Sequence, residues 1–151
     1  MIDECWNRKL KILVIEDNPG DVLLLKLALK AAELDCEFVV VTDGGAALAF
    51  VKDSENGGHA PVFDLAVLDL NLPKNDGLEV LDAMRASRLY RNVPVAVLSS
   101  SSSRREQAKI ERIRTARYIT KPPTLDEYLA VGRTIKKLFL ESGSRAAAAG
   151  A

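Results

Sequence analysis

Acidic side chains that directly follow apolar segments are the residues of this sequence best suited to chemistry. Asp69 ends the largely apolar run 63–69, and a segment rich in turn-forming residues follows it at once. Glu16 and Asp17 follow the apolar run 10–15 in the same way. If both runs are strands of an open α/β sheet, carboxylates at their C-terminal ends lie in the crevice where such sheets bind ligands. Asp69 is therefore the first candidate for a chemically active residue.

A cluster of acids at one place needs a cation to stabilise it. Carboxylates within about 5 Å of one another repel by about 3 kcal/mol per pair at an effective dielectric constant of about 20. Mg²⁺ binds oxygen ligands and keeps several waters, so it suits one or two carboxylates together with a phosphate oxygen. Lys121 directly follows the fifth predicted strand and supplies a second positive charge, and Ser99, at the end of the fourth, supplies a hydroxyl.

These groups match what phosphoryl transfer requires, because its catalysis consists largely of positioning and of neutralising negative charge. Asp69 would act as the nucleophile and form an aspartyl phosphate, a known class of covalent intermediate. Mg²⁺ and Lys121 would take up charge, and Ser99 would hydrogen-bond the product. The sequence thus predicts a phosphoacceptor site at Asp69.

Short strands alternate with helices along the chain. The predicted strands are rich in Val, Ile and Leu and cover Leu10 to Ile15, Glu37 to Val41, Leu65 to Asp69, Val95 to Ser99 and Tyr118 to Thr120. The predicted helices cover about Pro19 to Ala32, Gly45 to Lys52, Gly77 to Met84, Ser103 to Thr115 and Thr124 to Leu140. The last two helices each begin with the spacing of a capping box.

This alternation predicts an α/β fold. Strands that are nearly continuous in apolar residues belong to a parallel sheet with helices on both faces. For five strands joined by right-handed crossovers, we expect a doubly wound, flavodoxin-like sheet of strand order 2-1-3-4-5. That order brings Glu16, Asp17 and Asp69 side by side at the carboxyl edge of the sheet.

Composition indicates one domain. The 151 residues are 48% hydrophobic and carry a formal net charge of zero, so nothing global attracts nucleic acid or an anionic membrane. We expect a domain over residues 8–141 and a flexible low-complexity tail over 142–151, which contains four consecutive alanines. No apolar stretch approaches the roughly 20 residues of a membrane span, which favours a cytoplasmic protein. Cys5 and Cys36 are expected to be reduced thiols.

Taken together, the residues resemble the receiver domain of two-component response regulators. Over about Leu10 to Leu140, the residues that match this family at the ends of strands one, three, four and five are Glu16, Asp17, Asp69, Ser99, Lys121 and Pro122. The resemblance implies the receiver fold and a phosphohistidine on a sensor histidine kinase as the phosphoryl donor. It also implies that Asp17, Asp69 and the backbone carbonyl of Asn71 ligate Mg²⁺, while Glu16 acts through water.

The resemblance implies two further features. A cis peptide bond between Lys121 and Pro122 would aim the lysine inward, and proline makes that isomer accessible. Ser99 and Tyr118 would form the switch that reads the added phosphoryl charge, since the hydroxyl moves toward the charge and the aromatic ring turns inward. Segments 16–21 and 71–77 are similar to the small stand-alone regulators paired with phytochrome-type kinases.

Two other functions use related parts. An aspartyl-phosphate-type phosphatase resembles this site but has a second Asp two residues after its nucleophile, where this chain has Asn71. A pseudo-receiver that only binds partners would normally have a broken acidic pocket, whereas this one is intact. The receiver interpretation is therefore favoured.

The fourth and fifth predicted helices could form contacts with partners. The fourth is basic, which fits either a solvated face or a docking surface, with Arg104, Arg105, Lys109, Arg112 and Arg114. In the last helix, Val131, Leu138 and Leu140 exceed the core pattern, so we expect a homodimer through this helix and nearby elements. No DNA-binding segment follows Leu140, which predicts output by protein contact or onward phosphotransfer without direct DNA binding.

Overall fold

The computed structural model describes the backbone of residues 9–56, 61–72, 77–101 and 103–150, with side chains up to residue 142. Five strands alternate with helices through this part of the chain. In chain order the elements are β1 (Leu10–Ile15), α2 (Pro19–Ala31), β2 (Cys36–Val41), α3 (Gly44–Asn56), β3 (Leu65–Asp69), α4 (Gly77–Ala86), β4 (Val95–Ser99), α5 (Arg104–Glu111), β5 (Ala116–Thr120) and α6 (Leu125–Gly150).

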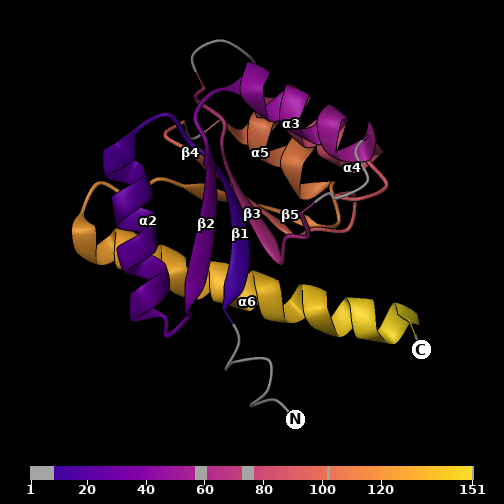
Figure 1. The fold of residues 1–151 in the computed structure, drawn as a ribbon. Helices are drawn as coiled ribbons and strands as arrows, with labels where there is room; N and C mark the ends of the chain where they lie inside the picture. The colour runs from indigo at the N-terminus through magenta and orange to yellow at the C-terminus, as the bar shows by residue number, and fades with distance from the viewer. Residues whose placement is uncertain (1–8, 57–60, 73–76, 102, 151) are drawn as a thin grey trace.

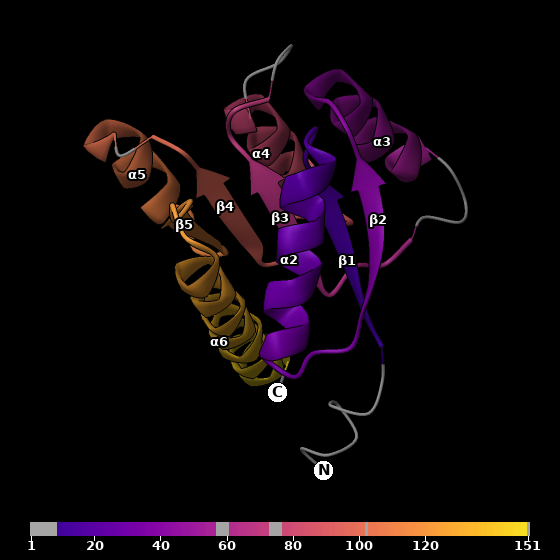
Figure 2. The same ribbon diagram turned by 90° about the vertical axis from the view of Figure 1, so that its left-hand side faces the viewer.

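The strands form one parallel sheet in the order β2-β1-β3-β4-β5, as the sequence predicts. Helices cover both faces, with α2 and α6 packed together on one side and α3, α4 and α5 on the other (Figure 1). The same layers are visible from the side in Figure 2. The predicted doubly wound, flavodoxin-like α/β fold is therefore confirmed.

Each face of the sheet has its own hydrophobic core. Successive strand residues point to opposite faces, and along β1 Leu13 and Ile15 enter the core under α3 and α4, while Ile12 and Val14 enter the core under α2 and α6. All of β3 and β4 is buried. Central strands covered on both faces explain the continuous apolar runs of the sequence.

Capping residues, and a proline in one case, mark where α2 and α5 begin at the carboxyl edge of the sheet. Asn18 caps α2 by accepting a hydrogen bond from the backbone N–H of Gly20, and Pro19 occupies the first turn, where no backbone donor is needed. Ser103 caps α5 by accepting a hydrogen bond from the N–H of Glu106. The capping-box spacing therefore identified the start of α5 correctly.

Helix ends depart more from the predictions. Helix α5, the fourth predicted helix, ends at Glu111 rather than Thr115, and α3 continues to Asn56. Helix α6 continues past Leu140 to Gly150, through the alanine run assigned to a flexible tail. Alanine has the highest intrinsic helix propensity, which accounts for this continuation. The division into residues 8–141 and 142–151 stays a prediction.

Two residues expected to be surplus on α6 are part of the core. Val131 and Leu138 are 4% and 6% exposed and pack in the core beneath α2 and α6, whereas Leu140 is 42% exposed. The exposed apolar surface of α6 is therefore smaller than the sequence pattern indicates.

Cys36 is the first residue of β2 and is partly buried. Burial, followed by the nearby charges of Asp35 and Asp64, raises the pKa of the Cys36 thiol to about 11. Cys36 is a free thiol, and Cys5 lies outside the described residues.

Over the described ranges, none of the helices combines the length and apolar character needed to cross a bilayer.

The contact between α2 and α6 depends on a glycine. A Cβ atom at Gly132 would lie 2.1 Å from the backbone oxygen of Ala28. The two helices therefore pack backbone to backbone at this point, and no side chain larger than hydrogen fits without moving one of them.

We expect Gly132→Ala to lower the free energy of unfolding by about 1–3 kcal/mol through overpacking, despite the higher helix propensity of alanine. Thermal and urea unfolding measure the effect. Arg133→Ala places the same residue at the next, exposed position and is the matched control. Equal stability of Gly132→Ala and the control would contradict the close helix contact.

Candidate functional site

Three predicted acids meet at the carboxyl edge of the sheet. β1 pairs with β3 in a register that places Ile15 beside Leu68, so the residues after these two come together. Carboxylate oxygens of Glu16, Asp17 and Asp69 all lie within 4.8 Å of one another. Glu16 and Asp69 are 5% and 3% exposed, whereas Asp17 is exposed.

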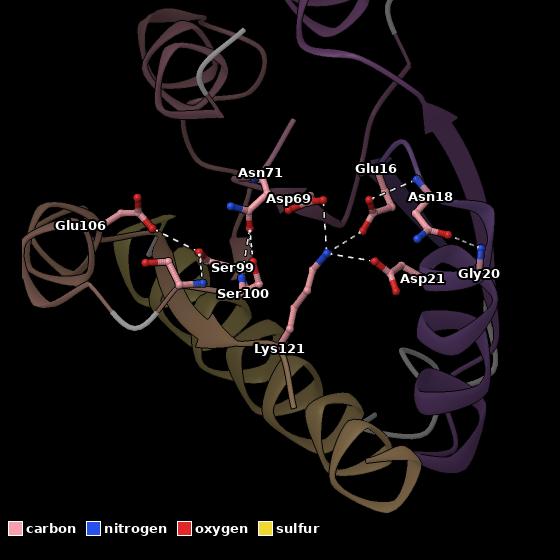
Figure 3. A network of polar contacts seen from close by, with 11 residues as sticks. Glu16, Asn18, Gly20, Asp21, Asp69, Asn71, Ser99, Ser100, Glu106 and Lys121 are labelled. Atoms are coloured by element: carbon pink, nitrogen blue, oxygen red, sulfur yellow. Dashed lines mark hydrogen bonds and ion pairs between the residues drawn. The ribbon is translucent and has the colours of Figure 1, made fainter. Parts of the chain in front are cut away.

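Lys121 extends from the end of β5 into this cluster. Its Nζ donates to Asp69 Oδ2 at 3.2 Å and to Glu16 Oε1 at 3.3 Å. It also donates to Asp21 Oδ2 at 3.0 Å, the shortest of its three ion pairs. Figure 3 shows the lysine between the acids of β1 and β3 and the first turn of α2. The ammonium group is thus shared by three carboxylates.

Asp21 is a residue of this site that the sequence analysis missed. It lies in the first turn of α2, four positions after Asp17. An acidic residue there is explained equally well by favourable interaction with the positive end of the helix dipole. The spacing that puts Asp21 one turn beyond Asp17, on the helix that starts from the acidic loop, is the signal that could have included it.

The pKa of Glu16 reflects crowding of negative charge. Burial and the neighbouring Asp69 carboxyl together raise the pKa of Glu16 to about 8, although the charge of Lys121 and the N–H of Asn18 oppose the rise. Burial lowers the pKa of Lys121, but the hydrogen bond to Asp21 and the charges of Asp69 and Glu16 outweigh burial and raise it overall. One ammonium therefore does not neutralise the acids around it.

The donor set fits a divalent metal ion. Glu16, Asp17 and Asp69 supply carboxylate oxygens, the ligands preferred by hard divalent cations. Asn71 lies next to the cluster, because its backbone N–H donates to Asp69 Oδ1 at 2.9 Å. Its side-chain Oδ1 accepts hydrogen bonds from the N–H and hydroxyl of Ser100, which fixes the loop after β3 against the loop after β4. The carbonyl of Asn71 as a ligand stays a prediction.

The predicted switch residues are both buried near the end of β4. Ser99 is 0% exposed, and its hydroxyl donates to Glu106 Oε1 at 3.2 Å. Tyr118 is 7% exposed, and its hydroxyl donates to the carbonyl of Ser101, with Glu106 Oε1 at 3.4 Å as a second acceptor. Glu106 was predicted only as part of a capping box, and its contacts with Ser99 and Tyr118 were missed.

Tyr128 of α6 is a buried residue that the sequence analysis did not include in the site. Its hydroxyl is buried and has no hydrogen-bond partner among the described residues. Burial raises its pKa to about 12, followed in effect by the charge of Asp21. The hydroxyl of Tyr128 on α6 therefore lies near enough to the site for the charges of Asp21, Lys121 and Glu16 to act on it.

The predicted cis bond between Lys121 and Pro122 is wrong, because the described part of the chain has only trans peptide bonds. A peptide bond before proline still favours trans by about 0.5–1 kcal/mol. The inward direction of Lys121 follows instead from its backbone, whose N–H donates to the carbonyl of Ser99 at 2.8 Å and extends the strand pairing.

Comparison with known proteins identifies the class. Residues 12–131 match the response regulator receiver domain, so the chain belongs to this family. It is 32% identical over 131 residues to the response regulator Rcp1 of Synechocystis sp. (strain ATCC 27184 / PCC 6803 / Kazusa), an alignment covering 87% of this chain and 89% of the relative.

Solved structures of response regulators also resemble this chain. The phosphorylated cyanobacterial phytochrome response regulator RcpA has a TM-score of 0.73 at 32% identity, with 88% of this chain and 95% of that chain covered. The Mn²⁺-bound form of Rcp1 has a TM-score of 0.74 at 32% identity, with 87% and 95% covered. The chain is therefore a receiver domain of the response regulator class with a signalling rather than an enzymatic role, and its acidic cluster is compatible with a divalent metal ion.

Lys121→Met should make stability depend more strongly on metal. Without the ammonium, the buried Glu16 and Asp69 carboxylates lose their partner, and we expect a loss of about 1–3 kcal/mol in EDTA. Excess MgCl₂ should raise the melting temperature of this variant more than that of the unchanged protein, because metal binds only the folded state.

Thermal unfolding with and without metal measures both effects. Lys137→Met removes an exposed lysine whose Nζ lies 4.0 Å from Glu141 Oε1, and it is the matched control with a small expected loss. A metal response of Lys121→Met no larger than that of the control would show that Lys121 does not balance this charge.

Proposed function

We propose that Asp69 accepts a phosphoryl group from the phosphohistidine of a sensor histidine kinase in a Mg²⁺-dependent reaction, and that the resulting conformational change is the output. The observation that carries this proposal is the position of Asp69. Its carboxylate is buried at the end of a central strand, 3.2 Å from the ammonium of Lys121 and beside Glu16 and Asp17.

The residues of the chain divide the reaction between them. A carboxylate oxygen of Asp69 attacks phosphorus, the bond from phosphorus to the histidine nitrogen breaks, and the imidazole leaves with that electron pair. Lys121 neutralises charge on the phosphoryl oxygens, and the hydroxyl of Ser99 donates a hydrogen bond to one of them. Mg²⁺, held by Asp17, Asp69 and the carbonyl of Asn71 with Glu16 through water, supplies further charge neutralisation when bound.

Relatives and the local surface support the choice of donor. The similar structures include a cyanobacterial phytochrome response regulator and a bacteriophytochrome response regulator, which favours a phytochrome-type kinase as partner. A cavity of about 300 Å³ opens beside Glu16 and Asp17, and the exposed Leu23 and Val40 line it. A kinase domain that docks there brings its phosphohistidine close to Asp69. The output then passes by protein contact or by onward phosphotransfer, in the cytoplasm.

Incubation with acetyl phosphate and MgCl₂, followed by intact mass measurement, tests the phosphoacceptor. We expect a mass gain of one phosphoryl group that Asp69→Asn abolishes, because the amide lacks the nucleophilic carboxylate. Asp53→Asn makes the same substitution at an exposed position of α3 and should retain the gain.

Two outcomes would contradict the proposal. A folded protein that gains no phosphoryl group would be a pseudo-receiver that only binds partners. Release of many equivalents of phosphate for each protein molecule, at a rate typical of enzymes, would identify an aspartyl-phosphate-type phosphatase.

The proposal includes a homodimer through α6 and neighbouring elements. The exposed Leu125 and Leu140 of α6 are the apolar contribution of this helix. In sedimentation velocity experiments with and without phosphorylation, we expect a dimer that Leu140→Lys dissociates. Leu89→Lys changes an equally exposed leucine elsewhere and should leave the dimer intact. Only monomer at micromolar concentration, in both states, would contradict it.

A further inference from the structure

Glu106 of α5 holds the hydroxyl that the phosphoryl group would need. We propose that Glu106 is a positioning residue that competes with the phosphoryl group on Asp69 for the single hydroxyl proton of Ser99 and so opposes the switch. This inference rests on the proposed function of Asp69 as phosphoacceptor. It assigns to Glu106 a role in setting how readily the switch responds.

The hydrogen bonds of Ser99 define the competition. A serine hydroxyl has one proton to donate, and in this structure Ser99 Oγ donates it to Glu106 Oε1 at 3.2 Å. The oxygen itself accepts the N–H of Ser101 at 3.1 Å. Figure 3 shows Ser99 and Glu106 pointing toward each other, while Lys121 points toward Asp69. Ser99 therefore cannot donate to the phosphoryl group without leaving Glu106.

The carboxylate of Glu106 is held ready to accept. Ser103 caps α5 through the N–H of Glu106, which fixes the first turn of the helix and with it the start of the Glu106 side chain. An acidic residue in the first turn is also stabilised by the helix dipole. Tyr118 contacts the same oxygen at 3.4 Å, but its one hydroxyl proton lies closer to the carbonyl of Ser101. Ser99 is therefore the main donor to Glu106.

The strength of this bond makes the competition effective. A hydrogen bond to an ionised carboxylate is roughly twice as strong as one between neutral groups, and Ser99 is fully buried, so water does not readily replace Glu106 as the acceptor of its hydroxyl proton. When Ser99 turns to the phosphoryl group, the half-buried Glu106 loses its main donor. The change at Asp69 then reaches α5, the basic helix, through one hydrogen bond.

Affinity for beryllofluoride, a phosphoryl analogue that binds with Mg²⁺, tests this role. Glu106→Gln keeps the size of the side chain but replaces the carboxylate with a weaker, neutral acceptor, so we expect binding to Asp69 about fivefold tighter. Glu106→Asp keeps the charge but is too short to reach Ser99, and it should act in the same direction. Affinity for Mg²⁺ alone should not change.

A double-mutant cycle separates competition from a structural effect. In the Ser99→Ala background there is no hydroxyl to compete for, so Glu106→Gln should no longer change beryllofluoride affinity. Glu111→Gln is the matched control, because it alters an exposed carboxylate of the same helix that accepts a hydrogen bond from the side chain of Gln107 rather than from Ser99. This control should bind like the unchanged protein.

Each result decides the proposal. Unchanged or weaker binding by Glu106→Gln and Glu106→Asp, or an effect that persists in the Ser99→Ala background, would overturn the role of Glu106 while leaving Asp69 as phosphoacceptor. Failure of the unchanged protein to bind beryllofluoride or to gain a phosphoryl group would instead overturn the proposed function itself. Tighter binding that depends on Ser99 would establish the competition.

Discussion

The site depends on one ammonium group shared by three acids. Nζ of Lys121 contacts Asp21, Asp69 and Glu16 at 3.0 to 3.3 Å, and these acids come from α2, β3 and the end of β1. Segments separated by about a hundred residues are thereby joined by charge at the edge of the sheet. The sheet order makes this possible, because β1 and β3 are neighbours and the lysine reaches across from β5. The sheet order brings the acids close together, and the positive charge of Lys121 reduces the repulsion between them.

The positive charge of Lys121 does not fully balance the acids around it. The raised pKa of Glu16 shows that burial and a neighbouring carboxyl outweigh the nearby lysine. A divalent metal adds the missing positive charge, and a phosphoryl group then brings negative charge of its own. The site can therefore pass through several charge states while the surrounding sheet, whose central strands are buried throughout, remains fixed.

Short sequence patterns predicted most of the fold and part of the candidate site. Strand-end acids, capping spacings and continuous apolar runs are short-range signals, so the sheet order and the meeting of Glu16, Asp17 and Asp69 could be predicted. The roles of Asp21 and Glu106 were missed, because they arise from contacts with Lys121, Ser99 and Tyr118 that join different elements. The surplus leucine and valine of α6 were misjudged for the same reason, since α2 covers them only in the folded chain.

The backbone contact between Gly132 and Ala28 has a consequence for how such a domain can diverge. Helix α2 carries Asp21 in its first turn, and α6 follows the loop that begins at Lys121. The close contact between these helices therefore also bears on the separation of Asp21, two turns before Ala28 in α2, and Lys121, which precedes α6. A larger residue at position 132 that moves α6 away from α2 would change the distance between this acid and this lysine as well as the helix packing, so signalling and stability both limit replacement at this position.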